Sequence, residues 1–475
     1  MSHANHADSR FATPLRIHSV PRAHLVGIAG SGMRSLAEVL SAAGWQISGS
    51  DLDTSSLAGC DWKIHAGHDA RNVSDDIDLV VRSNAIADDN PDLVQARALR
   101  IEVISYAAML GRLMESRTGV AIAGTHGKST TTAMAGAILV AAGYDPTVVC
   151  GARVPGSLSG GRHGRGRVML AEACEYRANF RHLKPQLAVI SGIEPDHLDC
   201  YASLGELEHA FAQLVACLPA DGLLLVRQEC AATARAIANR RAACETFGFS
   251  PSATWQATEL RERRGHYSFQ VRCRHRLVTQ VKLSVPGKHN VQNALAAAAI
   301  ASHLGATGAQ IRAGLDRFAG LERRMQVVAD DGQIAVVDDY AHHPTEVAAA
   351  LSTVRQLFPQ RRSCCVFQPH QLSRTRLLLH DFAVSLQNAE RVIVAPVFPA
   401  REEVSPAVEE LAQQLAIEAR GLGVHAVHLA KLEQIHDHLS GWLSPGDVVT
   451  TLGAGDIGRI AHELRQGLRT YRQAG

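Results

Sequence analysis

The amino-acid sequence predicts an α/β protein with mostly parallel, doubly wound sheets. Short apolar runs typical of buried strands alternate along the chain with apolar residues spaced three and four apart, which is the helix period. Several of these strands run into a glycine-rich turn at the start of a helix, as at residues 27–33, 124–129 and 453–456. Repeated strand–turn–helix units predict a parallel sheet covered by helices. The 475 residues are enough for about three domains of roughly 150 residues each.

The composition is that of a globular protein with a real core. Hydrophobic residues make up 46% of the chain and charged residues 20%, which is ordinary for a folded domain. The formal net charge of +2 predicts no strong field for nucleic acid or a membrane surface, so neither partner is expected. The ten cysteines show no C-x-x-C spacing, which favours a reducing compartment and the cytoplasm. Residues 1–10 are polar and contain no signal-peptide core, and no run of about 18 apolar residues predicts a membrane span.

The first strand–turn–helix unit has a βαβ pattern. A strand at residues 24–28 leads through the glycine turn at 27–33 into a helix, and a second strand ends at Asp51. An acid at that position often holds a ribose hydroxyl. Because Ala29 or Ser35 breaks the G-x-G-x-x-G fingerprint in either register, the turn favours a nucleotide diphosphate or sugar nucleotide over a nicotinamide cofactor. A plain structural turn is the alternative.

The second unit contains a phosphate loop. Residues 120–123 are typical of a buried strand, and Gly127, Lys128 and Ser129 then begin an apolar helix. In such a loop, backbone N–H groups bind phosphate oxygens, the lysine adds a point charge and the hydroxyl reaches Mg²⁺. Ile122 stands where the usual G-x-x-x-x-G-K-[ST] motif has its first glycine, so the loop is a variant. A glycine turn that merely caps a helix is the alternative.

Acidic residues and a histidine follow the next two strands. The strand at residues 168–170 leads to Glu172, and the strand at 187–191 leads to His197. Because the carboxyl ends of parallel strands share one edge, Glu172, His197 and Ser129 are the predicted Mg²⁺ ligands. The same strands also deliver Glu175, Glu194 and Asp196, with Asp199 and Cys200 as weaker candidates. Each acid taken alone is more often a solvated surface group.

A later helix is preceded by amide and imidazole side chains. His289, Asn290 and Asn293 come at the turn into an alanine-rich helix at residues 294–303, whose composition favours close helix packing. Amides donate and accept hydrogen bonds, which suits an adenine edge. An asparagine that caps the helix is the alternative.

The third unit begins near Leu321. Its strand at residues 334–338 runs into Asp339, His342 and His343. Adjacent histidines rarely hold one metal ion from a loop, so we predict that this pair contacts substrate or nucleotide. Residues 261–282, with alternating charged and aromatic positions, predict hairpin strands on a sheet edge.

In this order, the motifs resemble those of the Mur ligase family from about residue 22 to residue 465. The segments that carry the resemblance are residues 30–33, 48–51, 124–130, 287–290, 338–344, 367–370 and 453–456. The resemblance implies a Rossmann-like N-terminal domain for a UDP-sugar at 1–115 and a central P-loop ATPase domain with a mostly parallel sheet at 116–320. It also implies a Rossmann-like C-terminal domain for the amino acid at 321–475.

The resemblance also implies a chemistry, in which ATP drives the joining of L-alanine to UDP-N-acetylmuramate for peptidoglycan precursor synthesis. The lactyl carboxylate attacks the γ-phosphate of ATP, and the amine attacks the resulting acyl phosphate. Lys128 and Mg²⁺ would neutralise the two anions that this step brings together. By the same resemblance, Arg324 contacts the ATP phosphates and Asp339 is the acid of the C-terminal domain. Closure of that domain about a hinge at residues 320–324 is expected.

The predicted site residues fall into four groups. The catalytic group is Lys128, His197, Arg324 and Asp339. The ATP-binding group is Gly124, Thr125, His126, Gly127, Lys128, Ser129, Thr130, His289, Asn293 and Arg324. The substrate-binding group is Gly30, Ser31, Gly32, Met33, Asp51, Asn290, His342 and His343, and the metal group is Ser129, Glu172 and His197.

Two segments depart from the family pattern. In residues 172–177, Cys174 stands where the family usually has an acid, and Arg177 adds a charge. Residues 396–403 keep an A-R-E-E core among unusual neighbours. These departures bear on the choice of alanine, glycine or serine as the amine more than on the reaction.

Three other functions compete with this one. A related ligase joins a recycled tripeptide to the same sugar nucleotide and differs only in the amine. A P-loop kinase or NTPase would leave residues 338–344 without a role. A degenerate sugar-nucleotide-binding protein is disfavoured by the intact Lys128, Ser129, Glu172 and His197.

Overall fold

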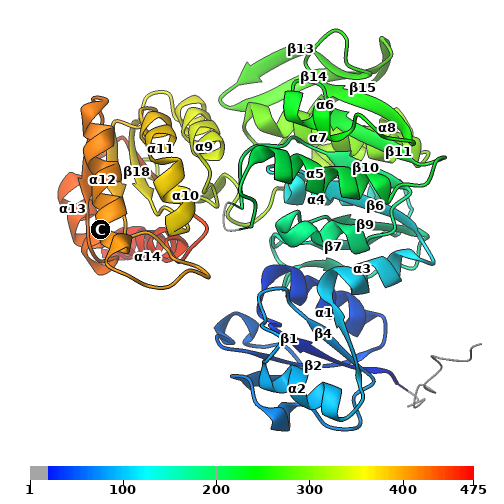
Figure 1. Ribbon diagram of the computed structural model, residues 1–475. Coiled ribbons are helices and arrows are strands. Elements are labelled where there is room, and N and C mark those ends of the chain that lie inside the picture. The colour runs from blue at the N-terminus through cyan, green and yellow to red at the C-terminus, as the bar shows by residue number, and fades with distance from the viewer. Residues whose placement is uncertain (1–19, 198–199, 475) are drawn as a thin grey trace, which may run out of the picture. The chain divides into compact units, whose positions relative to one another are not determined.

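The computed structural model describes residues 20–197 and 200–474, and within them it confirms the α/β class (Figure 1). Three sheets are present in these ranges. The first sheet lies in a compact unit, Met1–Met109, and the other two lie in a second unit, Leu110–Gly475. The domain boundaries at residues 115 and 320 stay predictions. The expectations for residues 1–10 and for Asp199 fall outside the described residues.

The sheet of the first unit has five parallel strands in the order β3-β2-β1-β4-β5. Its strands are β1 (Arg22–Val26), β2 (Gln46–Asp51), β3 (Lys63–Ala66), β4 (Leu79–Arg82) and β5 (Glu102–Ser105). Its helical segments are α1 (Ser31–Ala42), η1 (Ser55–Leu57), η2 (Ala70–Asn72) and α2 (Pro91–Ala98), and α3 (Tyr106–Met114) follows. The predicted strand at 24–28 lies two residues too late, because Gly27 has φ +81° and turns the chain out of the strand.

The central sheet has ten strands in the order β15-β14-β13-β12-β11-β10-β6-β9-β7-β8. Its first strands are β6 (Thr118–Ala123), β7 (Thr147–Cys150), β8 (Gly160–Arg162), β9 (Val168–Glu172) and β10 (Leu187–Ile190). They are followed by β11 (Leu223–Arg227), β12 (Ala243–Gly248), β13 (Trp255–Arg263), β14 (His266–Cys273) and β15 (Arg276–Lys282). Strands β13 to β15 form an antiparallel edge, which confirms the hairpins predicted there.

The helical segments that follow the central strands are α4 (Lys128–Ala141), η3 (Tyr176–His182), α5 (Leu204–Ala216), α6 (Ala231–Ala236), α7 (Lys288–His303) and α8 (Gly308–Arg317). Helix α7 begins six residues earlier than the alanine run, so His289, Asn290 and Asn293 lie in its first two turns. Residues 294–301 have no exposed surface, and α7 packs against α4. The close helix packing predicted from the alanine run is therefore confirmed.

The third sheet has the order β16-β17-β21-β18-β19-β20. Its strands are β16 (Gln326–Asp330), β17 (Ile334–Asp339), β18 (Arg362–Phe367), β19 (Arg391–Val394), β20 (His425–His428) and β21 (Asp447–Leu452). Its helices are α9 (Pro344–Leu357), α10 (Leu372–Leu377), α11 (Leu379–Leu386), α12 (Ala407–Gly421), α13 (Glu433–Trp442) and α14 (Gly458–Ala474).

Helices cover both faces of this third sheet. Val337 and Phe367 belong to one apolar cluster with residues of α9, α11 and α12. Val336 and Val366, one position earlier on the same strands, belong to another with residues of α13 and α14. This alternation places successive side chains on opposite faces, as a doubly wound sheet requires. No helix within the described ranges combines the length and apolar character needed to cross a bilayer.

Candidate active site

The loop between β6 and α4 has a backbone that requires glycine at two positions. Gly124 has φ +127° and Gly127 has φ +79°, both in the region that other residues rarely adopt. The hydroxyl of Thr125 donates to the backbone oxygen of Glu194 at 3.2 Å, which ties the loop to the segment after β10. The loop therefore curves around the N-terminus of α4, where phosphate oxygens bind favourably.

The Lys128 ammonium lies inside this loop. It donates to the backbone oxygens of Gly124 at 2.6 Å and Thr125 at 3.3 Å, and to Glu175 Oε1 at 2.9 Å. Burial opposes the charged form of Lys128, but the Glu175 carboxylate outweighs it and raises the pKa of the ammonium. Burial likewise opposes the charged form of Glu175, whose pKa is nevertheless lowered by Lys128 and His197. The loop thus holds a lysine that is charged at neutral pH beside the helix N-terminus.

The acidic residues and the histidine predicted to bind a metal ion lie at two different positions in the structure. Ligand atoms of Glu175, Asp196 and His197 lie within 4.8 Å of one another, and His197 Nε2 is 3.4 Å from Glu175 Oε1. Glu172, the last residue of β9, instead accepts the N–H of Gly151 at 2.5 Å. Its carboxylate still adds to the field that raises the pKa of Lys128. The His197 imidazole therefore lies beside Glu175, whereas the Glu172 carboxylate is bonded to Gly151.

A cavity beside the loop collects many of the predicted site residues. Eight of them line it: His126, Gly127, Thr130, His289, Asn290, Asn293, Arg324 and Asp339. They come from the phosphate loop, from α7 and from the segment around β16 and β17. Ser129 lies beside Thr130 in the first turn of α4 and is 9% exposed. The structure thus brings together residues that are up to about 200 positions apart in the chain.

The two asparagines of α7 form a short relay at the cavity wall. Asn293 Nδ2 donates to Asn290 Oδ1 at 3.0 Å, and Asn290 Nδ2 donates to the backbone oxygen of Pro286 at 2.6 Å. The N-cap of α7 is Gly287, so the alternative that an asparagine caps this helix is wrong. A Cβ on Gly127 would lie 2.4 Å from Asn293 Oδ1, so the relay also packs directly on the phosphate loop. Nearby, burial lowers the pKa of His289 to about 4.

Asp339 anchors the segment that carries Arg324. Its carboxylate accepts the N–H of Met325 at 2.7 Å and that of Ala341 at 2.8 Å. Burial raises the pKa of Asp339 to about 6, although Arg324 and the two N–H donors oppose the rise. Met325 has φ +49°, so the predicted hinge at residues 320–324 borders on a strained backbone that this carboxylate holds in place.

Two charged residues that the sequence analysis did not choose join the third sheet to the central one. Arg374 Nε donates to Asp196 Oδ1 at 3.0 Å in a pair that is almost fully buried, and the guanidinium holds the pKa of Asp196 well below its usual range despite burial. Glu346 Oε1 lies 3.1 Å from His126 Nδ1 and 3.9 Å from Arg324, and its Oε2 accepts the N–H of His342 at 3.1 Å. The only signal in the sequence was the spacing of four residues from His342 to Glu346 and from His370 to Arg374.

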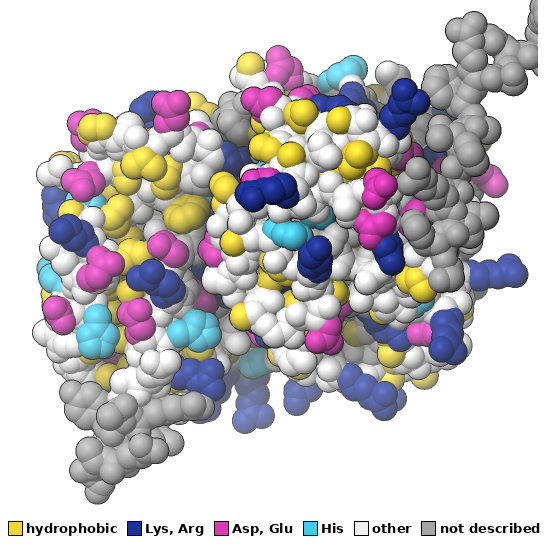
Figure 2. Space-filling view, turned by 90° about the horizontal axis from the view of Figure 1, so that it is seen from below, with side chains coloured by type: hydrophobic (Ala, Val, Ile, Leu, Met, Phe, Trp, Pro, Cys, Tyr) yellow, Lys and Arg dark blue, Asp and Glu magenta, His cyan; other side chains and the backbone are white. Residues whose placement is uncertain are grey.

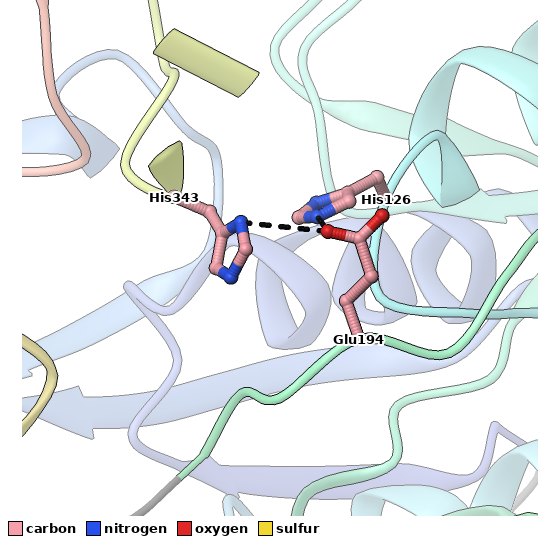
Figure 3. Close-up of side chains that lie close together, drawn as sticks. All are labelled: His126, Glu194 and His343. Atoms are coloured by element: carbon pink, nitrogen blue, oxygen red, sulfur yellow. Dashed lines mark ion pairs between the residues drawn. The ribbon is translucent and has the colours of Figure 1, made fainter. Parts of the chain in front are cut away.

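His342 and His343 point to different neighbours. His342 Nδ1 lies 2.9 Å from the backbone oxygen of Tyr340, and burial lowers the pKa of its imidazole to about 4. His343 caps α9, because its Nδ1 accepts the N–H of Thr345 at 3.3 Å. Its ring lies 4.7 Å from the ring of His126, so the second histidine, rather than the first, faces the phosphate loop (Figure 3).

The predicted sugar-nucleotide residues of the first unit share one turn. Gly30 is the N-cap of α1, Ser31, Gly32 and Met33 form its first turn, and Met33 is buried. Asp51 Oδ2 accepts the N–H of Ala29 at 2.9 Å, so the acid at the end of β2 reaches the glycine turn.

On the face drawn in Figure 2, acidic and basic side chains are interspersed, in keeping with a net charge of +2.

Three family models cover most of the chain. The model described as the Mur ligase family catalytic domain matches residues 22–118, the Mur ligase middle domain matches 122–301, and the Mur ligase glutamate ligase domain matches 323–455.

Curated relatives and solved structures agree with these matches. The UDP-N-acetylmuramate–L-alanine ligase of Geotalea uraniireducens is 39% identical over 455 residues, which are 95% of this chain and 98% of the relative. That of Acidithiobacillus ferrooxidans is 41% identical over 458 residues, which are 94% and 98%. The crystal structure of UDP-N-acetylmuramate–alanine ligase from Thermotoga maritima superposes with a TM-score of 0.80 at 28% identity and covers 96% of this chain and 100% of that one. A murein peptide ligase from Psychrobacter arcticus shares the fold with a TM-score of 0.71 at 24% identity, covering 94% and 98%.

Proposed function

The chain belongs to the Mur ligase family, and we propose that it joins L-alanine to UDP-N-acetylmuramate while ATP is converted to ADP and phosphate. The product is a precursor of peptidoglycan. Curated relatives that carry this activity in their names are similar over nearly the full length of this chain. The three domains we propose are residues 1–115 for the UDP-sugar, 116–320 for ATP and 321–475 for the amino acid.

The observation that carries the proposal is the cavity beside the phosphate loop. It joins the loop to Asn290 and Asn293 of α7 and to Arg324 and Asp339 of the third part of the chain. A simple NTPase would need only the loop and its metal ligands. A ligase needs a second surface facing the γ-phosphate, where an acceptor carboxylate and an amine can be positioned.

The first chemical step brings two anions together. The lactyl carboxylate of UDP-N-acetylmuramate attacks the γ-phosphate of ATP, and ADP leaves. The approach of two negative charges costs on the order of several kcal/mol unless cations neutralise them. We assign this task to the Lys128 ammonium, which already lies among the loop carbonyls, and to Arg324, which lines the cavity. The amine of alanine then attacks the acyl phosphate, and phosphate leaves as the amide forms.

The residues around His197 suit a magnesium ion. Glu175 and Asp196, whose carboxylates lie near the His197 imidazole, offer the oxygen ligands that Mg²⁺ prefers. Two buried atoms, Glu175 Oε2 and His197 Nδ1, have no hydrogen-bond partner among the described residues. Their lone pairs can therefore bind a metal ion or accept hydrogen bonds from its waters. When bound there, Mg²⁺ would add positive charge at the transferring phosphoryl group. Ser129, Glu172 and His197 remain our proposed ligands, and Glu175 joins them; to bind the same ion, Glu172 would have to give up its hydrogen bond from Gly151.

Closure of the C-terminal part completes the proposed site. The Arg374–Asp196 pair and the Glu346–His126 contact both link the third sheet to loops of the central sheet. Such contacts suit a closed form that shields an acyl phosphate from water. The reducing compartment predicted from the cysteines and the use of two nucleotide substrates support a cytoplasmic location for the proposed reaction.

The tripeptide ligase of cell-wall recycling is the alternative function. The murein peptide ligase superposes with a TM-score of 0.71 at 24% identity, whereas the UDP-N-acetylmuramate–alanine ligase of Thermotoga maritima superposes with a TM-score of 0.80 at 28% identity. The alternative is therefore the less supported of the two.

Release of ADP by the purified chain separates these functions. With ATP and Mg²⁺ present, we expect ADP only when UDP-N-acetylmuramate and an amine are both added, and the fastest rate with alanine among alanine, glycine, serine and the tripeptide. The faster rate with tripeptide would favour the recycling ligase. Equal turnover with either co-substrate omitted would contradict ligation and indicate a simple NTPase.

A further inference from the structure

Three side chains converge beside the phosphate loop, and no chemical step described above is assigned to them, although His126 and His343 are predicted to contact ATP and substrate. His126 follows β6, Glu194 follows β10 and His343 precedes α9, and one ligand atom of each lies within 4.8 Å of the others (Figure 3). His126 Nε2 is 3.4 Å from Glu194 Oε2, and His343 Nδ1 is 3.8 Å from the same oxygen. We refer to these three residues as the His126 cluster.

The spacing of these atoms fits a tetrahedral metal ion. Zinc lies about 2.0–2.1 Å from its nitrogen and oxygen ligands, so a tetrahedral arrangement separates two ligands by about 3.4 Å. The separations of 3.4 and 3.8 Å in the His126 cluster are close to this value. Two imidazoles and one carboxylate are also a common protein ligand set for zinc and neighbouring transition metals.

The outer atoms of the cluster are held as those of metal ligands usually are. His126 Nδ1 lies 3.1 Å from Glu346 Oε1, and His343 Nε2 lies 3.2 Å from the backbone oxygen of Pro195. If both of these nitrogens carry the proton, the inner nitrogens present lone pairs to Glu194. Metal-binding histidines typically donate their other N–H to a carboxylate or a backbone oxygen in this way. The Glu194 carboxylate is itself oriented by the Thr345 hydroxyl, which donates to it at 2.6 Å.

The inner atoms are also available to an ion. His126 Nε2 has no hydrogen-bond partner among the described residues. His343 Nδ1 accepts only the long helix-cap bond from Thr345, at 3.3 Å, which a stronger ligand would replace. The side chains of His126 and Glu194 are 22% and 31% exposed, whereas the His126 Nε2 atom is buried.

Two carboxylates lie next to His126, so a cation would be favoured in the cluster. Glu194 and Glu346 flank His126, while Lys128 is bonded to Glu175, Arg374 to Asp196, and Arg324 stays 3.9 Å from Glu346. A metal ion bound by His126 would place positive charge beside these two carboxylates.

We propose that His126, Glu194 and His343 form a binding site for a zinc-class transition metal ion. The site is separate from the oxygen-rich group of Glu175, Asp196 and His197. Because His126 belongs to the phosphate loop and His343 to the start of α9, a bound ion would fasten the central sheet to the third one. The proposal does not depend on the identity of the ligase substrates.

Cobalt(II) is the probe that tests this site, because its visible absorption reports tetrahedral coordination by nitrogen and oxygen. The full-length chain is titrated with Co²⁺ in millimolar Mg²⁺, which occupies oxygen-rich sites. We expect one Co²⁺ per chain with a tetrahedral spectrum that Zn²⁺ abolishes by competition. Glu194→Gln keeps the size of the side chain, and His343→Asn keeps a good helix cap. Each should weaken Co²⁺ binding at least tenfold.

The matched control is His197→Asn, which removes a histidine from the other group at a position with φ +54°, where asparagine is tolerated. It should leave the Co²⁺ titration unchanged. Circular dichroism and thermal melting establish that each variant is folded. Unchanged binding in both Glu194→Gln and His343→Asn, a loss confined to His197→Asn, or an intense thiolate charge-transfer band would each overturn the proposal.

Discussion

Two strand–turn–helix units, one in the first unit and one in the central part, both leave their strand through a glycine at positive φ but hold opposite charges. The residue after β1 is Gly27 (φ +81°), and the residue after β6 is Gly124 (φ +127°). The helix N-caps differ, because Gly30 has φ −57° and Gly127 has φ +79°. Neither helix has a side-chain cap, so both leave backbone N–H groups for a ligand. The first turn gives the N–H of Ala29 to the Asp51 carboxylate, whereas the second surrounds the Lys128 ammonium with its carbonyl oxygens.

This difference shows that the shape of each turn and the ligand it favours are determined by different residues. The positive φ values shape a turn that any phosphate or sugar could approach. The charge of one side chain then selects the ligand: an ammonium favours the phosphates of ATP, and a carboxylate accepts hydrogen bonds from sugar hydroxyls. Substitution of the charged residues and the glycines tests whether the two turns bind different ligands.

The largest expected effect comes from the lysine. Lys128→Ala should lower kcat for ADP release by a factor on the order of 10² or more, because charge stabilisation is lost mainly in the transition state. Steady-state kinetics with saturating substrates measure this change. Lys184→Ala, which removes an exposed lysine paired with Glu115, is the matched control and should leave the rate unchanged.

The same substitution leaves Glu175, whose side chain is 1% exposed, without its partner, so the melting temperature should also fall. Lys128→Met combined with Glu175→Gln removes both charges and should restore the melting temperature without restoring the rate. A near-wild-type rate in either variant would show that Lys128 does not act in the reaction. The proposed difference between the two turns would then be wrong.

The two glycines give the second effect, and they separate shape from function. Gly27→Ala and Gly127→Ala each force a positive φ on alanine, which costs about 1–2 kcal/mol of stability. The new Cβ would lie 2.9 Å from Ser83 Cβ in the first turn and 2.4 Å from Asn293 Oδ1 in the second. Both variants should therefore melt earlier, but only Gly127→Ala should weaken ATP binding, by roughly tenfold, since a displaced Asn293 lines the cavity.

Gly44→Ala is the control for strain alone, because φ is +93° there and nothing lies within 4 Å of the new Cβ. Calorimetric titration with a non-hydrolysable ATP analogue measures the affinity. Equal loss of ATP binding in Gly27→Ala and Gly127→Ala would mean that the two turns do not divide the ligands between them.

The smallest effect is expected from the acid of the first turn. Asp51→Asn keeps an oxygen that can accept the N–H of Ala29 but removes the charge. We expect the KM for UDP-N-acetylmuramate to rise on the order of tenfold, the size of a lost hydrogen bond to a charged group, with the KM for ATP unchanged. Asp53→Asn, at an exposed position two residues later, should change neither value. A rise in the KM for ATP instead would show that the first turn binds ATP and would contradict the prediction.

The sequence by itself determined the local units. Apolar period and glycine position located β6 and α4 to within two residues, and the alanine run predicted the packing of α7. These features follow from short-range steric and hydrophobic rules, which act between residues close in the chain. The glycines and the hydroxyl residue around Lys128 likewise identified it as the lysine of a phosphate loop, because that motif is contiguous in the chain.

Only the tertiary structure decided which charges meet. The sequence analysis chose Glu172 as the partner of His197, but Glu172 ends β9 and turns to Gly151, while Glu175 reaches both Lys128 and His197. Arg374 and Asp196 are 178 residues apart, and His126 and Glu346 are 220 apart. Such contacts depend on how whole sheets pack and on which way a strand's last side chain points. Neither is encoded in a local pattern, because one residue of shift sends a side chain to the opposite face of the sheet.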